Sequence, residues 1–67
     1  MKVNELRGRM VAKGLTQEKL ARQLGITPKT FSAKLKKGIF NSNEMKQMVD
    51  ILEISNPIDI FFGEKVS

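Results

Sequence analysis

The chain contains no cysteine, no histidine, no tryptophan and no tyrosine. Without Cys or His it cannot form a disulfide framework, a zinc finger, a thiol nucleophile or an imidazole base, so no metal site, catalytic site or cofactor is expected. Apolar runs are also short, and none exceeds three residues, as at positions 60–62. Such runs are too short for a membrane span or a signal-peptide core, which predicts a cytoplasmic protein.

The length of 67 residues predicts one domain, 1–67, with no room for a deep catalytic cleft. The seven acidic side chains form no catalytic constellation, so we do not expect an enzyme. Charge is divided unevenly: residues 1–37 carry ten basic and two acidic side chains, a net +8, whereas residues 38–67 carry two basic and five acidic ones, a net −3. A basic half favours a nucleic-acid partner, although a solvated surface would also account for it, and the acidic, apolar half suits self-association.

Apolar residues recur at helical spacing in five segments separated by short turns, without strand-like alternation. Residues that can cap helix N-termini are Thr16, Thr27, Asn41 (with Glu44 as a capping box) and Asn56 (in Asn56-Pro57-x-Asp59). Glycines that can end helices are Gly14, Gly25 and Gly38. The sequence therefore predicts an all-α, compact five-helix domain, with residues 63–67 as a frayed tail.

Residues 16–38 are the most informative segment, because two helices are joined there by only Gly25 and Ile26. So short a connection forces the helices to cross steeply. Ala21 is small where the second helix would cross, Gly25 can adopt a left-handed turn, and Ile26 is expected to fill the core behind it.

The run Gln17-x-x-x-Ala21-x-x-x-Gly25-Ile26-Thr27, with Phe31 after it, resembles the helix-turn-helix of the Cro and phage-repressor (XRE-type) family. Members of that family have lambda-repressor-like domains of five helices that bind operator DNA, and the resemblance extends over nearly the whole chain. It implies that the helix following Thr27 is a recognition helix for the DNA major groove.

The angular positions of residues on this third helix predict which side chains face outward. With Phe31 and Leu35 as the buried edge, about 100° per residue places Ala33 at the centre of the opposite face. The side chains expected to contact DNA bases are Lys29, Thr30, Ser32 and Ala33. Those expected to contact phosphate are Gln17, Thr27, Lys36, Lys37, Asn41 and Ser42. The lysines could instead be solvated surface charges, and Asn41 could serve only as a helix cap.

One position departs from the family pattern. A second apolar residue usually follows three positions after the one at Phe31, but this sequence has Lys34 there and places the apolar residue at Leu35. We therefore expect the third helix to be rotated or slightly extended.

The C-terminal end holds more apolar side chains than one face of a short helix can bury. The resemblance implies dimerisation through this end, with one recognition helix per half-site about 34 Å apart on a pseudo-palindromic operator. The expected interface, within residues 51–62, comprises Ile51, Ile58, Ile60, Phe61 and Phe62. Alternatively, Phe61 and Phe62 close the core of a monomer and Ile60 is a stray exposed residue.

These features predict a sequence-specific regulator of transcription that binds double-stranded operator DNA as a homodimer, most simply a Cro-like repressor of phage or prophage type in the bacterial cytosol or nucleoid. No membrane and no small-molecule substrate are expected. One alternative is an antitoxin-like autoregulator whose C-terminal end binds a partner protein. Another is a helical adaptor that does not bind DNA.

Overall fold

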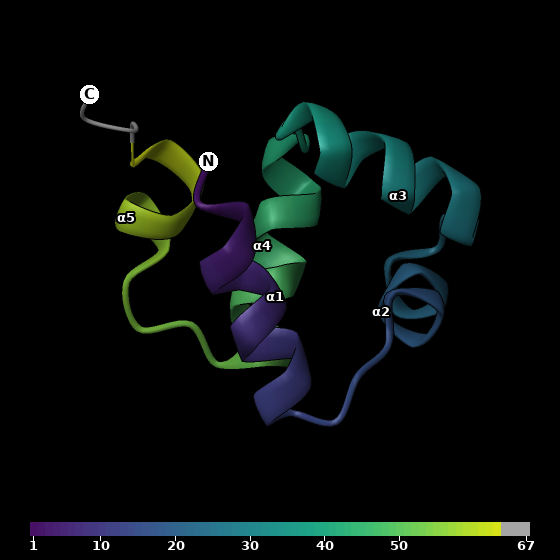
Figure 1. The fold of residues 1–67 in the computed structure, drawn as a ribbon, viewed down its shortest axis with the longest axis horizontal. Helices are drawn as coiled ribbons and strands as arrows, with labels where there is room; N and C mark the ends of the chain where they lie inside the picture. Colours follow the sequence, from purple (N-terminus) through teal and green to yellow (C-terminus); the bar gives the residue numbers. More distant parts are fainter. Residues whose placement is uncertain (64–67) are drawn as a thin grey trace.

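Capping residues and glycines divide the chain into helices much as their chemistry predicts. The computed structural model describes residues 1–63, which form five helices and no strand (Figure 1). The helices are α1 (Val3–Ala12), α2 (Gln17–Leu24), α3 (Pro28–Lys37), α4 (Ser42–Leu52) and α5 (Pro57–Phe62). The predicted compact all-α domain with five helices is therefore confirmed, while most of the predicted tail, residues 64–67, lies outside the described residues.

Three of the predicted N-caps form. Thr16 and Thr27 each accept a hydrogen bond from a backbone N–H three residues on, at 3.1 Å, which satisfies an amide that the first turn leaves free. Asn41 caps α4 and forms the predicted capping box with Glu44. Gly25 and Gly38 end α2 and α3 in the left-handed conformation, with φ of 77° and 72°.

The predicted cap of α5 is wrong. Asn56 makes no side-chain cap bond and has non-capping backbone angles, φ −130° and ψ 62°. Its amide oxygen instead accepts a hydrogen bond from Arg9 of α1 at 3.2 Å, and its amide nitrogen donates to Asp59 at 3.3 Å. A tertiary contact with α1 therefore takes the place of the local cap.

The helices surround one apolar core. Its fully buried large side chains are Phe31, Leu6, Leu20, Leu35, Met48, Leu52 and Ile60. Phe40, in the loop between α3 and α4, is also buried, with its ring centroid 5.4 Å from that of Phe31. This pair ties the end of α3 to the core, although periodicity gave no reason to place a loop residue there.

The α5 segment corrects part of the predicted dimer interface. Ile60 has no exposed surface and Phe61 is buried, so both belong to the core of the monomer. The backbone N–H of Lys2 donates to the Ile60 carbonyl at 2.8 Å, which fastens the N-terminus over α5 and covers the inward side of this helix. Ile58 and Phe62 remain 76% and 65% exposed. The alternative is confirmed for Phe61, which is buried, and wrong for Phe62, which is exposed, and for Ile60, which is buried.

The molecule is elongated, with extents of 33 × 22 × 20 Å. Helices α2 and α3 lie at one end of the longest axis, whereas α5 and the N-terminus lie at the other, with α1 and α4 between them (Figure 1). Among residues 1–63, no helix has the length and apolar character required to cross a membrane. The fold therefore separates the predicted DNA-reading helix from the predicted self-association segment.

Candidate nucleic-acid interface

Helix α3 has a buried edge and an exposed polar face. Phe31 and Leu35 are both buried in the core, as their spacing predicts. All the α3 residues predicted to face DNA after Thr27 are exposed: Lys29, Thr30, Ser32, Ala33, Lys36 and Lys37. The structure thus leaves these side chains available for contact, and their role toward DNA stays a prediction.

The turn between α2 and α3 fixes the direction of the exposed helix. Ala21 has no exposed surface, and its small side chain allows α2 to pack closely against the core. Gly25 adopts the left-handed conformation, and the N–H of Ile26 returns to the Ala21 carbonyl at 3.0 Å. Ile26 itself is half-buried and packs against the core, as expected for a residue behind the turn.

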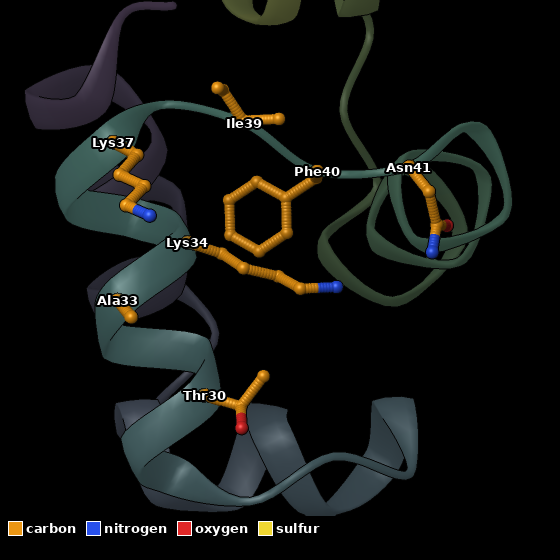
Figure 2. Close-up of a pocket in the computed structure, with 7 residues that line it drawn as sticks. All are labelled: Thr30, Ala33, Lys34, Lys37, Ile39, Phe40 and Asn41. Carbon is orange, nitrogen blue, oxygen red and sulfur yellow. The ribbon is translucent and has the colours of Figure 1, made fainter.

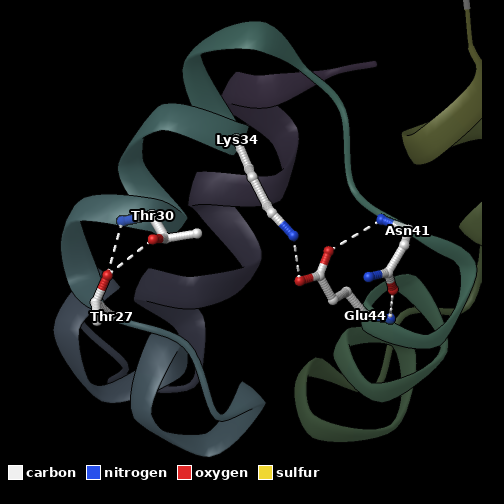
Figure 3. A network of polar contacts seen from close by, with 5 residues as sticks. All are labelled: Thr27, Thr30, Lys34, Asn41 and Glu44. Carbon is white, nitrogen blue, oxygen red and sulfur yellow. Dashed lines mark hydrogen bonds and ion pairs between the residues drawn. The ribbon is translucent and has the colours of Figure 1, made fainter.

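The start of α3 is ordered by two threonines (Figure 3). The Thr27 hydroxyl oxygen accepts from the Thr30 N–H at 3.1 Å, and the two hydroxyl groups are hydrogen-bonded to each other at 2.9 Å. Both side chains are exposed at the start of α3, where a hydroxyl group can contact a base or a phosphate.

The lysines of α3 differ in their ionic partners. Within residues 1–63, no acidic side chain lies at ion-pair distance from Lys29, Lys36 or Lys37. Lys34, in contrast, pairs with Glu44 of α4. Among residues 1–63, Glu44 is the one charged residue that is buried. Three of the four lysines on this helix thus keep their charge uncompensated, which makes the exposed face strongly cationic.

The Glu44 carboxylate is stabilised in its charged form. Burial acts to raise its pKa, but hydrogen bonds from Lys34 and from the Asn41 backbone, together with the Lys34 charge, outweigh burial and hold the pKa of Glu44 below its ordinary value. The sequence pattern indicated Glu44 only as part of the capping box. The one signal for its pairing was Lys34 itself, which stands where the family that the sequence resembles has an apolar residue.

An open groove of about 490 Å³ runs between α3 and the loop that leads to α4 (Figure 2). Its lining consists of Thr30, Ala33, Lys34, Lys37, Ile39, Phe40 and Asn41. The four α3 residues stand at positions i, i+3, i+4 and i+7, and therefore form one stripe along the helix. The structure thus brings two predicted base-contacting residues and two predicted phosphate-contacting residues to one groove, whose remaining lining is Lys34 and the apolar loop.

Four predicted phosphate contacts lie outside the groove: Lys36 is in the last turn of α3, and the other three lie at the starts of helices. Gln17 is the first residue of α2 and is half-buried, Thr27 is the exposed N-cap of α3, and Ser42 is the exposed first residue of α4. Asn41 lines the groove, and its side-chain oxygen accepts from the Glu44 N–H at 2.7 Å. Its use as a cap therefore restricts any contact by Asn41 to its amide nitrogen.

Residues 1–63 contain no group of three or more His, Cys, Asp or Glu side chains that could hold a metal ion. No protein-family model, curated protein or solved structure matches the chain. The features that bear on function are therefore the geometry and charge of the α3 face and the resemblance in residues 17–31.

Proposed function

We propose that this chain is a sequence-specific, double-stranded DNA-binding regulator of transcription, of the helix-turn-helix type found in Cro and phage repressors, and that it acts as a repressor. The exposed cationic face of α3 carries this proposal, because Lys29, Lys36 and Lys37 have no acidic partner within residues 1–63. Helix α2 and the Gly25 turn support α3 from behind, as a helix that enters a groove requires.

Side-chain chemistry divides the α3 face into two parts. Lys29 and Thr30 lie in the first turn, where recognition helices reach base edges, and Ala33 can contact a thymine methyl group. Lys36 and Lys37 lie in the last turn and suit phosphate. Gln17 and Ser42, each the first residue of a helix, would add phosphate contacts favoured by the helix dipole.

The opposite end of the molecule supports a homodimer. Ile58 and Phe62 are exposed on α5, and Ile51 is partly buried on α4, so apolar surface remains for a second copy to cover. Two copies would present two α3 helices to the half-sites of a pseudo-palindrome. The same apolar surface would also suit a different partner protein, as in an antitoxin-like autoregulator.

Selection from a pool of random duplexes tests the DNA-reading proposal. The expected product is a palindromic sequence with two half-sites about one helical turn apart, because a dimer presents its two recognition helices with two-fold symmetry. A variant with Lys46→Ala, which alters an exposed lysine of α4 away from the α3 face, should select the same sequence. Recovery of no enriched sequence would contradict sequence-specific binding.

Sedimentation distinguishes the two uses of the α5 surface. A homodimer should sediment at twice the chain mass, and Phe62→Ser should return it to the mass of one chain. A wild-type protein that stays monomeric both alone and on its selected DNA would contradict the homodimer and favour a different protein partner.

A further inference from the structure

The pair formed by Lys34 and Glu44 links α3 to the start of α4 (Figure 3). One carboxylate oxygen of Glu44 accepts from the Lys34 ammonium, and the other accepts from the Asn41 backbone N–H at 2.9 Å. Glu44 is only 5% exposed, so both of its acceptors are used inside the protein. The Lys34 ammonium therefore faces a fixed, buried anion.

Lys34 nevertheless lies on the stripe of α3 that borders the groove. It occupies the position between Ala33 and Lys37 in the groove lining, and its side chain reaches across toward the start of α4 (Figure 2). About a third of this side chain is exposed. Without Glu44, the long flexible stem would let the ammonium turn outward beside Lys37.

We propose that Glu44 sets the affinity of the interface for DNA: it withdraws the Lys34 cation from DNA phosphate and so lowers affinity for DNA of any sequence. This inference rests on the proposed DNA-binding function. Glu44 is a positioning residue in this role, since it acts through Lys34 and is itself too buried to reach DNA.

Withdrawal of a cation lowers affinity without altering discrimination. Contacts between lysine and phosphate strengthen binding to all sequences alike, whereas contacts at the α3 N-terminus distinguish one sequence from another. Three lysines of α3 have no acidic partner among residues 1–63 and already attract this helix to phosphate. A fourth would raise the affinity for every duplex by about the same factor, so the ratio of selected to random affinity would not change.

The variant Glu44→Gln tests this role. Glutamine is accepted at this position of a capping box, so the Asn41 N–H keeps an acceptor while the carboxylate charge is lost. Because each additional phosphate contact steepens the dependence of log affinity on log salt concentration by about 0.9, we expect the slope on random duplex DNA to steepen by about that amount. Affinity for random DNA at low salt should rise, and affinity for the selected duplex should rise by a similar factor.

Two matched variants calibrate the measurement. The double variant Glu44→Gln/Lys34→Gln removes both charges of the pair and should return the slope to that of the wild type. Lys37→Gln removes an uncompensated lysine from the same groove and should make the slope shallower by about 0.9. A purely structural role of Glu44 would alter thermal stability in Glu44→Gln and leave the salt slope unchanged, which would overturn the proposal.

The double variant decides the matter even if Glu44→Gln does not fold, which circular dichroism reports. If Lys34 contacts phosphate in the wild type, the salt slope of the double variant should be shallower than that of the wild type by about 0.9, as for Lys37→Gln. That result would show the proposal to be wrong. A slope equal to that of the wild type supports it. If the wild type shows no salt-dependent binding to duplex DNA, the proposed function itself fails, and this outcome is distinct from wild-type binding with a slope that Glu44→Gln does not alter.

Discussion

The two ends of the molecule expose different kinds of side chain. At the α2–α3 end, Lys29, Lys36 and Lys37 are exposed and have no acidic partner among residues 1–63. At the α5 end Lys2 and Asp59 form an ion pair at 2.9 Å, and the apolar side chains of Ile58 and Phe62 are exposed. One end therefore favours a polyanion and the other an apolar surface, which is how a small domain can use two partners at once.

Substitution of Phe31 should have the largest effect at the α2–α3 end. The ring is fully buried and packs against Phe40, so Phe31→Ala should lower the free energy of unfolding by about 3–5 kcal/mol because it creates a cavity. Urea denaturation followed by circular dichroism measures this change. Val11→Ala, at an exposed site on α1, is the control and should change it by less than about 0.5 kcal/mol. Similar losses in the two variants would contradict the assigned core.

At the α5 end, neighbouring apolar residues should separate into two classes. Ile60→Ala should cost about 2–5 kcal/mol of monomer stability, since Ile60 is fully buried. Phe62→Ser, at an exposed position, should leave monomer stability nearly unchanged and weaken self-association in sedimentation. If Phe62→Ser unfolds the monomer, or if Ile60→Ala affects association alone, the division between core and surface on α5 is wrong.

Within the α3 face, substitutions of Lys29 and Lys37 should have different kinds of effect on DNA binding. Lys29→Ala should reduce discrimination at one base pair by about 1–3 kcal/mol, because its position in the first turn reaches base edges. Lys37→Ala should weaken binding to all sequences alike and reduce the salt slope by about 0.9. Titration of selected and random duplexes by fluorescence anisotropy measures both. Equal losses on the two DNAs for Lys29→Ala would remove its base-reading role.

Low pH should produce the smallest change in stability, and the ion pairs determine whether stability rises or falls. The pKa values of Glu44, Glu53 and Asp59 are lowered in the folded protein, mainly by hydrogen bonds from lysines, although burial opposes the shift at Glu44. A carboxyl group whose pKa is lower in the folded than in the unfolded protein stabilises the fold at pH values above its ordinary pKa. This stabilisation is lost as the pH falls through the pKa of the folded protein. Thermal unfolding should therefore shift to lower temperature below about pH 4.

Removal of one carboxylate tests which ion pair is responsible for the loss of stability in acid. Glu44→Gln should lose less stability than the wild type over this acid range, since it lacks the buried carboxylate that titrates. Glu53→Gln should differ less from the wild type, because its partner Lys13 and its own side chain are solvent-exposed and the pair is screened. Parallel acid profiles for wild type and Glu44→Gln would contradict the stabilising role of this ion pair.

Local chemistry made much of the fold predictable. Threonine and asparagine caps, together with glycines at left-handed positions, act over three or four residues, and Thr16, Thr27, Asn41, Gly25 and Gly38 all behave as expected. The exposed face of α3 followed in the same way from the spacing of its two buried residues. Features set within one helix or one turn can therefore be inferred from the sequence alone.

Features that depend on distant contacts could not be inferred. Ile60 packs into the core while the N-terminus bonds to its carbonyl, and the Asn56 side chain bonds to Arg9 instead of capping α5. Phe40 becomes part of the core because the loop turns its ring onto Phe31. None of these contacts leaves a periodic pattern in the sequence, since each joins segments that only the folded chain brings together.

The most direct test of the division between the two ends is an NMR titration of the labelled protein with its selected duplex, followed by dilution of the free protein. We expect DNA to shift amide resonances along α3 and in residues 39–42, and dilution to shift resonances around Ile58 and Phe62. Amide shifts on adding DNA that are centred on α5, or absent from α3, would contradict this division.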